Sequence, residues 1–161
     1  MLSTSTTRKD FNPDIIRDPI SDARRYVNNA RDTLRDNGKL NTKTGLYEDS
    51  KYVKAAGNYL WSGVLIALDA VFHVKKEKKN KKGDNSRIDF DDYIAVITKR
   101  DKKLLSLATN GYQIMHLYMT YDGIQDKNTC ASGFRLANEI IDWCEKALGK
   151  PTDQTTGEQI N

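Results

Sequence analysis

The sequence contains few of the residues that interrupt helices. Its 161 residues include only three prolines and ten glycines. A sheet fold with many tight turns draws heavily on both residue types, because each supplies a backbone conformation that turns need. No segment alternates apolar and polar residues between hairpin signals, as a half-buried strand would. We therefore expect an all-α fold.

Residues suited to metal or covalent chemistry are also scarce. The two histidines, His73 and His116, fall in different predicted helices, and the sequence has no C-x-x-C, H-E-x-x-H or Glu-x-x-His pattern. It also has no glycine-rich phosphate loop. These absences predict a domain that uses no metal and no cofactor.

The chain has only two cysteines, Cys130 and Cys144. If both lie on the last helix, they are roughly 21 Å apart along its axis, whereas a disulfide requires Cα atoms within about 7 Å. Free thiols are typical of a reducing compartment. The first ten residues contain no apolar core for a signal peptide. The sequence thus predicts a cytoplasmic protein.

Length and composition indicate one soluble domain. The chain is 38% hydrophobic and 30% charged, with a net charge of +4. The ends are polar and lack apolar periodicity. We expect a flexible N-terminal segment at residues 1–17, a single domain at residues 18–149 and a disordered tail at residues 150–161.

Five segments repeat apolar residues at three- and four-residue steps, which is the period of a helix. They span residues 18–38, 50–74, 89–98, 101–121 and 129–148. Residues 39–48 are expected to form a connecting loop. Short connections favour antiparallel neighbours. The pattern predicts an up-and-down antiparallel bundle of four long helices, with residues 89–98 as one additional short helix.

The longest apolar segment, residues 50–74, is the expected centre of this bundle. Small residues lie among its large ones, so neighbouring helices can approach closely and on more than one side. Asn58, Ser62 and Asp69 interrupt it, which argues against a membrane span. Two interpretations of Asp69 stay open: it binds a ligand or proton, or it pairs with a cation or tyrosine of a neighbouring helix.

A run of lysines follows the central segment and accounts for more than the whole net charge. Its members are Lys75, Lys76, Lys78, Lys79, Lys81 and Lys82. Such a run is typical of a nucleic-acid patch or of a frayed helix end that leads into a solvated loop. No aromatic residue interleaves the lysines, as a stacking platform for single strands would require. The pattern favours the solvated helix end.

The clearest group of candidate site residues surrounds His116. Tyr112 precedes His116 by four residues and Tyr118 precedes Asp122 by four, so each pair is expected to share a helix face. A histidine with a pKa of about 6.5 can act as a general base. The alternative interpretation is a hydrogen-bonded histidine in the core or at an interface.

The layout resembles the HEPN superfamily of small four-helix domains. The resemblance rests on the first helix at residues 23–34, the segment YLWSGVLIAL at residues 59–68, and His116 followed by Tyr118. Over about residues 20–148 the chain is also similar to an uncharacterised bacterial family. Its members have an SGVLIALDA-like second helix, an SKRDKKLL-like joint (residues 98–105 here) and a YDG end (residues 121–123).

Many HEPN domains are ribonucleases or partners of nucleotidyltransferases, and they act as dimers. The resemblance implies a site with an arginine, a polar neighbour and a histidine a few residues further on. His116 matches the histidine and Asn110 the polar neighbour, whereas the arginine position holds Thr109. A guanidinium would neutralise the charge of a scissile phosphate, which a threonine cannot do.

We therefore expect a non-enzymatic binding module that forms a homodimer or binds another protein, without membrane contact. Its candidate ligand or interface residues are Asn110, Tyr112, His116, Tyr118, Asp122 and Asp69. One alternative is a metal-independent ribonuclease, or a toxin–antitoxin-like nucleotidyltransferase partner, with His116 as the candidate catalytic residue. The other is nucleic-acid binding through the lysine run.

Overall fold

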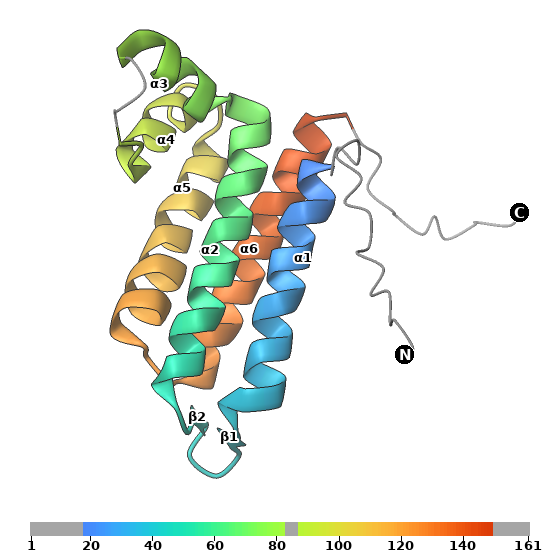
Figure 1. Ribbon diagram of the computed structural model, residues 1–161, viewed down its shortest axis with the longest axis vertical. Helices are drawn as coiled ribbons and strands as arrows, with labels where there is room; N and C mark the ends of the chain where they lie inside the picture. Colours follow the sequence, from blue (N-terminus) through green and yellow to red (C-terminus); the bar gives the residue numbers. More distant parts are fainter. Residues whose placement is uncertain (1–17, 83–86, 150–161) are drawn as a thin grey trace, which may run out of the picture.

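The computed structural model describes residues 18–82 and 87–149 (Figure 1). Within this part the fold is helical apart from one short hairpin, which confirms the predicted all-α class. The elements in chain order are α1 (Pro19–Thr33), the π-helical turn η1 (Leu34–Gly38), β1 (Leu40–Asn41), β2 (Leu46–Tyr47), α2 (Ser50–Phe72), α3 (Val74–Lys82), α4 (Phe90–Ile97), α5 (Lys102–Gly111), the π-helix η2 (Tyr112–Asp122) and α6 (Lys127–Ala147). The predicted flexible segment at residues 1–17 and the predicted tail at residues 150–161 lie outside the described residues.

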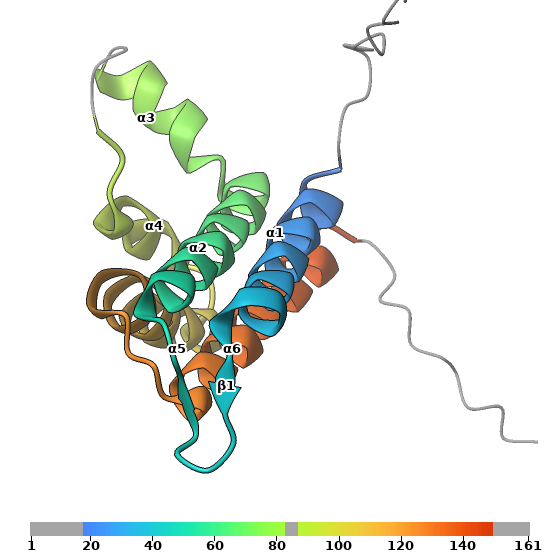
Figure 2. The same ribbon diagram turned by 60° about the horizontal axis from the view of Figure 1, so that its bottom comes forward.

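The central position belongs to α2, which packs against α1, α6 and η2 (Figure 1). α5 continues directly into η2, because Tyr112 follows Gly111 in a right-handed helical conformation. The four rods formed by α1, α2, α5 with η2, and α6 lie side by side and alternate in direction (Figures 1 and 2). The hairpin lies at one end of these rods, and α3 and α4 lie at the other.

Two glycines of α2 allow the close approach that its small residues predict. A Cβ atom built on Gly63 would lie 2.8 Å from the carbonyl oxygen of Ala23 in α1. One built on Gly57 would lie 2.8 Å from the carbonyl oxygen of Met115 in η2. Because the two glycines face different neighbours, α2 is contacted on more than one side, as its wide apolar set indicates.

The first helix begins where its sequence predicts. The Asp18 side chain accepts a hydrogen bond from the backbone N–H of Ser21 at 3.1 Å, and Pro19 occupies the first helical position. The face of α1 that packs into the core carries Ile20, Ala23, Val27 and Ala30. The final turn widens into η1, and Gly38 is buried with its Cα against the ring of Tyr47.

The connection at residues 39–48, which the sequence predicts as a loop, contains a short antiparallel β-hairpin. Leu40 pairs with Tyr47, and Asn41 with Leu46. The hairpin is held by the chain that enters α6: the Tyr47 N–H donates to the carbonyl of Gln125, and the Lys127 N–H donates to the carbonyl of Gly45, both at 2.9 Å. These partners are distant in sequence, so no local pattern indicates them.

The central helix ends earlier than predicted. α2 stops at Phe72, and His73 adopts a left-handed conformation with φ of 52°. This conformation redirects the chain, because non-glycine residues with positive φ do not continue a right-handed helix. The lysine run then forms a separate helix, α3, where the sequence favoured a frayed end and a loop.

By length and composition, α2 alone among the described helices would suffice to cross a membrane. Its most apolar 18-residue window has a mean hydropathy of 1.3, and 44% of that window is buried inside the protein. The core helix of a globular protein meets the same criteria. The packing of α2 against three neighbours accounts for its composition without a membrane.

Candidate functional site

The most unusual element is the π-helix η2. Extended π-helices are rare, and shorter π-bulges are frequent at functional sites. In η2 residues five apart meet: Gln113 Nε2 donates to the hydroxyl of Tyr118 at 2.8 Å, and Thr120 Oγ1 donates to the carbonyl of Met115 at 2.7 Å. In an α-helix such residues lie about 140° apart around the axis. The wider winding therefore determines which side chains share a face.

An aromatic cluster surrounds His116 on η2. The rings of Phe90 and Tyr112 stack with centroids 4.4 Å apart and planes 2° from parallel. His116 lies 5.0 Å from the ring of Tyr112 and 5.8 Å from the ring of Tyr121. Trp61 of α2 is only 7% exposed and lies behind the cluster, 6.0 Å from His116. Side chains from α4 and η2 thus form one aromatic face in front of Trp61 of α2. We define this aromatic face as Phe90, Tyr112, His116 and Tyr121.

The outer edge of this face is open. Tyr121 is 70% exposed, which is the largest exposure among the large apolar side chains of the described residues. Phe90, Tyr112 and His116 are half-buried. Solvent-accessible aromatic side chains are common in binding surfaces, because they offer a large contact area at a low cost in conformational entropy.

Burial lowers the pKa of His116 below its ordinary value. Desolvation disfavours the charged imidazolium, so the ring is neutral at pH 7. Its ring contacts are with Trp61, Tyr112 and Tyr121. Within the described residues none of its contacts is an ion pair or a hydrogen bond. The neutral ring therefore acts here as an aromatic surface with two free nitrogen atoms.

We expect His116 to titrate below the value of an unfolded histidine, which can be measured by NMR through its ring protons. Since the folded state binds the proton less tightly, this residue contributes stability above the unfolded pKa and loses it as the pH falls through the folded pKa. His116→Asn should therefore lessen the acid destabilisation between about pH 7 and pH 5. His73→Asn is the matched control, because His73 is exposed. A His116 pKa equal to that of an unfolded histidine would contradict the role of burial.

The structure brings together only part of the predicted site. Tyr112 and His116 are neighbours, as their spacing predicts. Within the described residues, Tyr118 and Asp122 form no hydrogen bond with each other: the Tyr118 hydroxyl accepts from Gln113, and Asp122 is exposed at the end of η2. Asn110 is exposed near the end of α5.

Three members of the cluster were not singled out by the sequence as site residues. They are Trp61, Phe90 and Tyr121. One signal in the sequence could have indicated the wider helix: Gly111, Met115, Met119 and Gly123 are all buried, at strict four-residue steps. This spacing is longer than the 3.6-residue period of an α-helix.

Within the described residues Asp69 makes no ion pair with a lysine or an arginine. Its Oδ1 accepts a hydrogen bond from the backbone N–H of Lys75 at 3.0 Å, so it caps the start of α3. The residue is half-exposed, and Asn58 and Ser62 are not buried either. Tyr93 lies nearby and is 2% exposed; burial, with the negative charge of Asp69, raises its pKa to about 12. The carboxylate thus caps α3 through a backbone partner, and Tyr93 of the neighbouring helix α4 is close enough to feel its charge.

The lysine run forms α3, and its side chains are unevenly exposed. Lys75, Lys76, Lys79 and Lys81 are exposed, whereas the side chain of Lys82 lies outside the described part. Lys78 forms an ion pair with Asp92 of α4 at 2.5 Å and also donates to the carbonyl of Arg87. Its side chain is 12% exposed. Lys78 therefore ties α3 to α4, and the hydrogen bond from Lys78 holds the pKa of the Asp92 carboxyl below its usual value.

Replacing Lys78 should loosen α3 without unfolding the domain. We expect Lys78→Ala to speed hydrogen exchange of the α3 amides and to lower the free energy of unfolding by about 1 kcal/mol or less, since the pair is partly solvated. Lys76→Ala, which removes an exposed lysine from the same helix, is the control and should leave exchange unchanged. Equal exchange in both variants would contradict a tethering role for Lys78.

The described residues contain no group of three or more His, Cys, Asp or Glu side chains placed to hold a metal ion. Both cysteines are buried, and burial raises the pKa of each thiol to about 12. A thiol with such a pKa remains protonated at neutral pH and is a poor nucleophile. The chemistry available at the aromatic face is therefore that of rings, hydroxyls and a neutral imidazole.

The fold and the aromatic face define a small helical domain built around one apolar central helix. The chain belongs to the family described as "Domain of unknown function (DUF5618)", whose match covers residues 18–146. It is also similar to the solved structure of a protein of unknown function from Dyadobacter fermentans. That likeness has a TM-score of 0.69 and 41% sequence identity, and it covers 81% of this chain and 95% of that one. No curated protein matches the chain.

Proposed function

We propose that this domain is a non-enzymatic binding module that associates with a second copy of itself through the aromatic face. The observation that carries this proposal is the exposed ring of Tyr121 beside a half-buried histidine and a stacked Phe90–Tyr112 pair. Tyrosines are enriched among the residues that dominate interface energies. If the chain alone is monomeric, we propose that the aromatic face binds a different protein with similar surface chemistry.

Sedimentation equilibrium of the purified chain tests this proposal with Tyr121→Glu. Because Tyr121 is 70% exposed, this change introduces a charge into the face with little effect on folding. We expect the wild-type chain to be dimeric and the variant to be monomeric. Leu148→Glu is the matched control, because Leu148 is an exposed apolar residue outside the face. A dimer that survives Tyr121→Glu would place the interface elsewhere, and a monomeric wild type would contradict self-association.

The proposed setting is a reducing cytoplasm. Support comes from Cys130 and Cys144, which are both free and buried on α6. A thiol-reactive reagent added to the folded chain should modify neither cysteine until the chain is denatured. The polar residues that interrupt α2, together with its position in the core, support a protein that works without membrane contact.

A relationship to the HEPN superfamily is part of the same proposal. It is supported by the four rods of alternating direction and by the position of His116 on the third of them. A metal-independent ribonuclease, or a nucleotidyltransferase partner, is the alternative function within that relationship. Against catalysis stands Thr109, which occupies the arginine position and donates its hydroxyl to the carbonyl of Leu105.

Incubation of the chain with mixed RNA, beside His116→Ala, distinguishes catalysis from binding. A ribonuclease would cleave RNA in a manner that depends on His116. We expect no such cleavage, because the contacts of His116 within the described residues are aromatic and offer no cation to the phosphate.

Nucleic-acid binding through α3 is the remaining alternative. It is supported by the four exposed lysines of α3, at positions 75, 76, 79 and 81. Binding of this kind would weaken steeply with salt, because each neutralised phosphate releases counterions. It would also fall in the double variant Lys75→Gln with Lys76→Gln. Binding that is insensitive to salt would exclude this alternative.

A further inference from the structure

The aromatic face contains one group that changes charge in mildly acidic solution, the imidazole of His116. Its ring contacts are with Trp61, Tyr112 and Tyr121, at centroid distances of 6.0, 5.0 and 5.8 Å. The hydroxyls of the two tyrosines stay protonated below about pH 9, and Phe90 has no titratable group. A proton taken up by His116 would therefore be the first charge to appear in this face.

The charged groups of η2 and α2 do not pair with His116. Lys54 of α2 lies against the end of η2, where its Cε is 2.8 Å from the position that a Cβ of Gly123 would take. Asp69, near the other end of α2, caps α3. Asp122 is exposed as the last residue of η2. Among the residues that the structure describes, none of these three groups forms an ion pair with His116, and burial is the cause of its lowered pKa.

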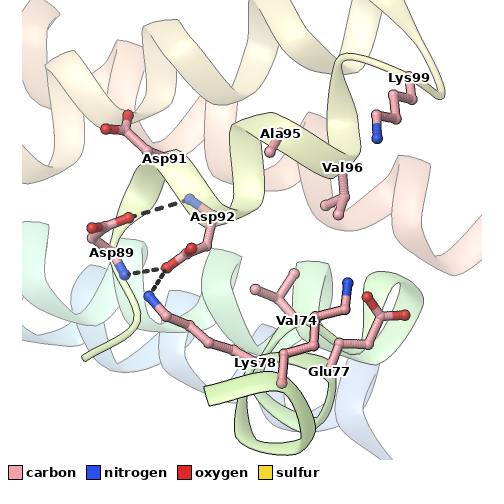
Figure 3. Close-up of a pocket in the computed structure, with 10 residues that line it drawn as sticks. Val74, Glu77, Lys78, Asp89, Asp91, Asp92, Ala95, Val96 and Lys99 are labelled. Atoms are coloured by element: carbon pink, nitrogen blue, oxygen red, sulfur yellow. Dashed lines mark hydrogen bonds and ion pairs between the residues drawn. The ribbon is translucent and has the colours of Figure 1, made fainter. Parts of the chain in front are cut away.

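The other helices near η2 also bring no counter-ion to His116. The carboxylates of α4 line the cleft between α3 and α4 (Figure 3), and they are Asp89, Asp91 and Asp92. Lys102 and Lys103 are exposed in the first turn of α5. On α6, Arg135 and Glu139 pair with each other at 2.9 Å. No charged group of these helices contributes to the shift in the pKa of His116, which burial alone causes.

Because the proposed partner is a second copy of the chain, the groups that would cover His116 are known. In a twofold dimer the same patch lies on both sides of the interface. The second copy would bring its own aromatic face, which contains no carboxylate. A protonated His116 would lose water without gaining a counter-ion, and the two imidazolium groups would repel each other.

Self-association and protonation therefore oppose each other. The faces of aromatic rings attract cations, yet the pKa of His116 is lowered, so desolvation outweighs this attraction. Covering the face removes more water and lowers the pKa further. At a pH above the pKa of the separate copies, both forms are neutral and association does not depend on pH. As the pH falls below that value, the separate copies take up protons that the dimer does not, so dissociation is favoured.

We propose that His116 makes self-association of this domain depend on pH, so that two copies are joined at neutral pH and separate in mildly acidic solution. This inference rests on the proposed dimer through the aromatic face and adds the condition under which that dimer comes apart. A different protein that placed a carboxylate opposite His116 would show the reverse dependence, because the imidazolium would then gain a counter-ion.

Sedimentation equilibrium of the full chain between about pH 7.5 and pH 5 tests the proposal. We expect the dissociation constant of the wild-type dimer to rise about tenfold to a hundredfold, because each copy contributes up to about tenfold at one unit below its histidine pKa. His116→Gln has no titratable group at this position, so its dissociation constant should change less than about twofold, whatever its value at neutral pH. His73→Gln is the matched control and should follow the wild type, because His73 is exposed.

A second measurement does not depend on how well the chain stays folded in acid. The pKa of His116, followed by NMR through its ring protons, should be lower in a concentrated, dimeric sample than in a dilute, monomeric one, while the pKa of His73 should be equal in both. A wild type that is monomeric at neutral pH contradicts the proposed dimer, and this inference with it. A wild-type dimer that is insensitive to pH, or a His116→Gln dimer that is equally sensitive to acid, overturns only the role of His116.

Discussion

Leu60→Ala should lower the free energy of unfolding by about 2–5 kcal/mol. Leu60 is fully buried on α2, and its Cδ1 lies 3.4 Å from where a Cβ of Gly133 in α6 would stand. Truncation removes apolar contacts with that neighbour and leaves a cavity between two helices that are packed too closely to collapse into it. Urea unfolding followed by circular dichroism measures the change.

The matched control for this substitution is Leu148→Ala. Leu148 is 39% exposed at the end of α6, so the same change should cost about 0.5 kcal/mol or less. Similar losses in the two variants would mean that α2 is not the centre of the core.

Gly57→Ala should destabilise the domain by about 1–3 kcal/mol, although alanine is the better helix former by about 1 kcal/mol. A Cβ at this position would lie 2.6 Å from the Cβ of Met119 and 2.7 Å from Oγ1 of Thr120. It would also lie 2.8 Å from the carbonyl oxygen of Met115. Since a backbone atom is among these contacts, the steric clash can be relieved only if η2 itself shifts.

Hydrogen exchange locates that shift: amides of η2 should exchange faster in Gly57→Ala, while those of α1 should be unaffected. Asn58→Ala, one residue further along α2, is the control, because Asn58 is exposed and its replacement should be neutral or slightly stabilising. If Gly57→Ala were as stable as Asn58→Ala, the close approach of α2 and η2 would not exist in solution.

The core could be predicted from the sequence because it follows from periodicity. The three- and four-residue spacing of apolar residues at positions 50–72 predicted a helix, and this helix is buried on more than one side. The start of α1 was predicted from Asp18 and Pro19. The end of α2 could not be predicted, because His73 enters a left-handed conformation that its type does not require. The lysine run likewise gave no sign of a helix held by Lys78 and Asp92.

The candidate site could be predicted only in part. The spacing of Tyr112 and His116 indicated that they meet, and they do so. Phe90 lies on another helix, and its stacking on Tyr112 depends on how α4 packs against α5 and α2. Tyr121 reaches His116 because the helix between them is wider than an α-helix, and side-chain spacing alone assumes the commoner winding.

The sequence alone determined the helical class, the central helix and the buried faces, because hydrophobic periodicity is a local property of the chain. The tertiary structure decided the hairpin, the direction of α3, the π-helical winding of η2 and hence which aromatic rings form a surface. These features depend on contacts between distant residues: the hairpin on the chain entering α6, α3 on Asp92, and η2 on its close packing against Gly57. The free energy that stabilises each of these features comes from residue pairs that form only after the helices have packed.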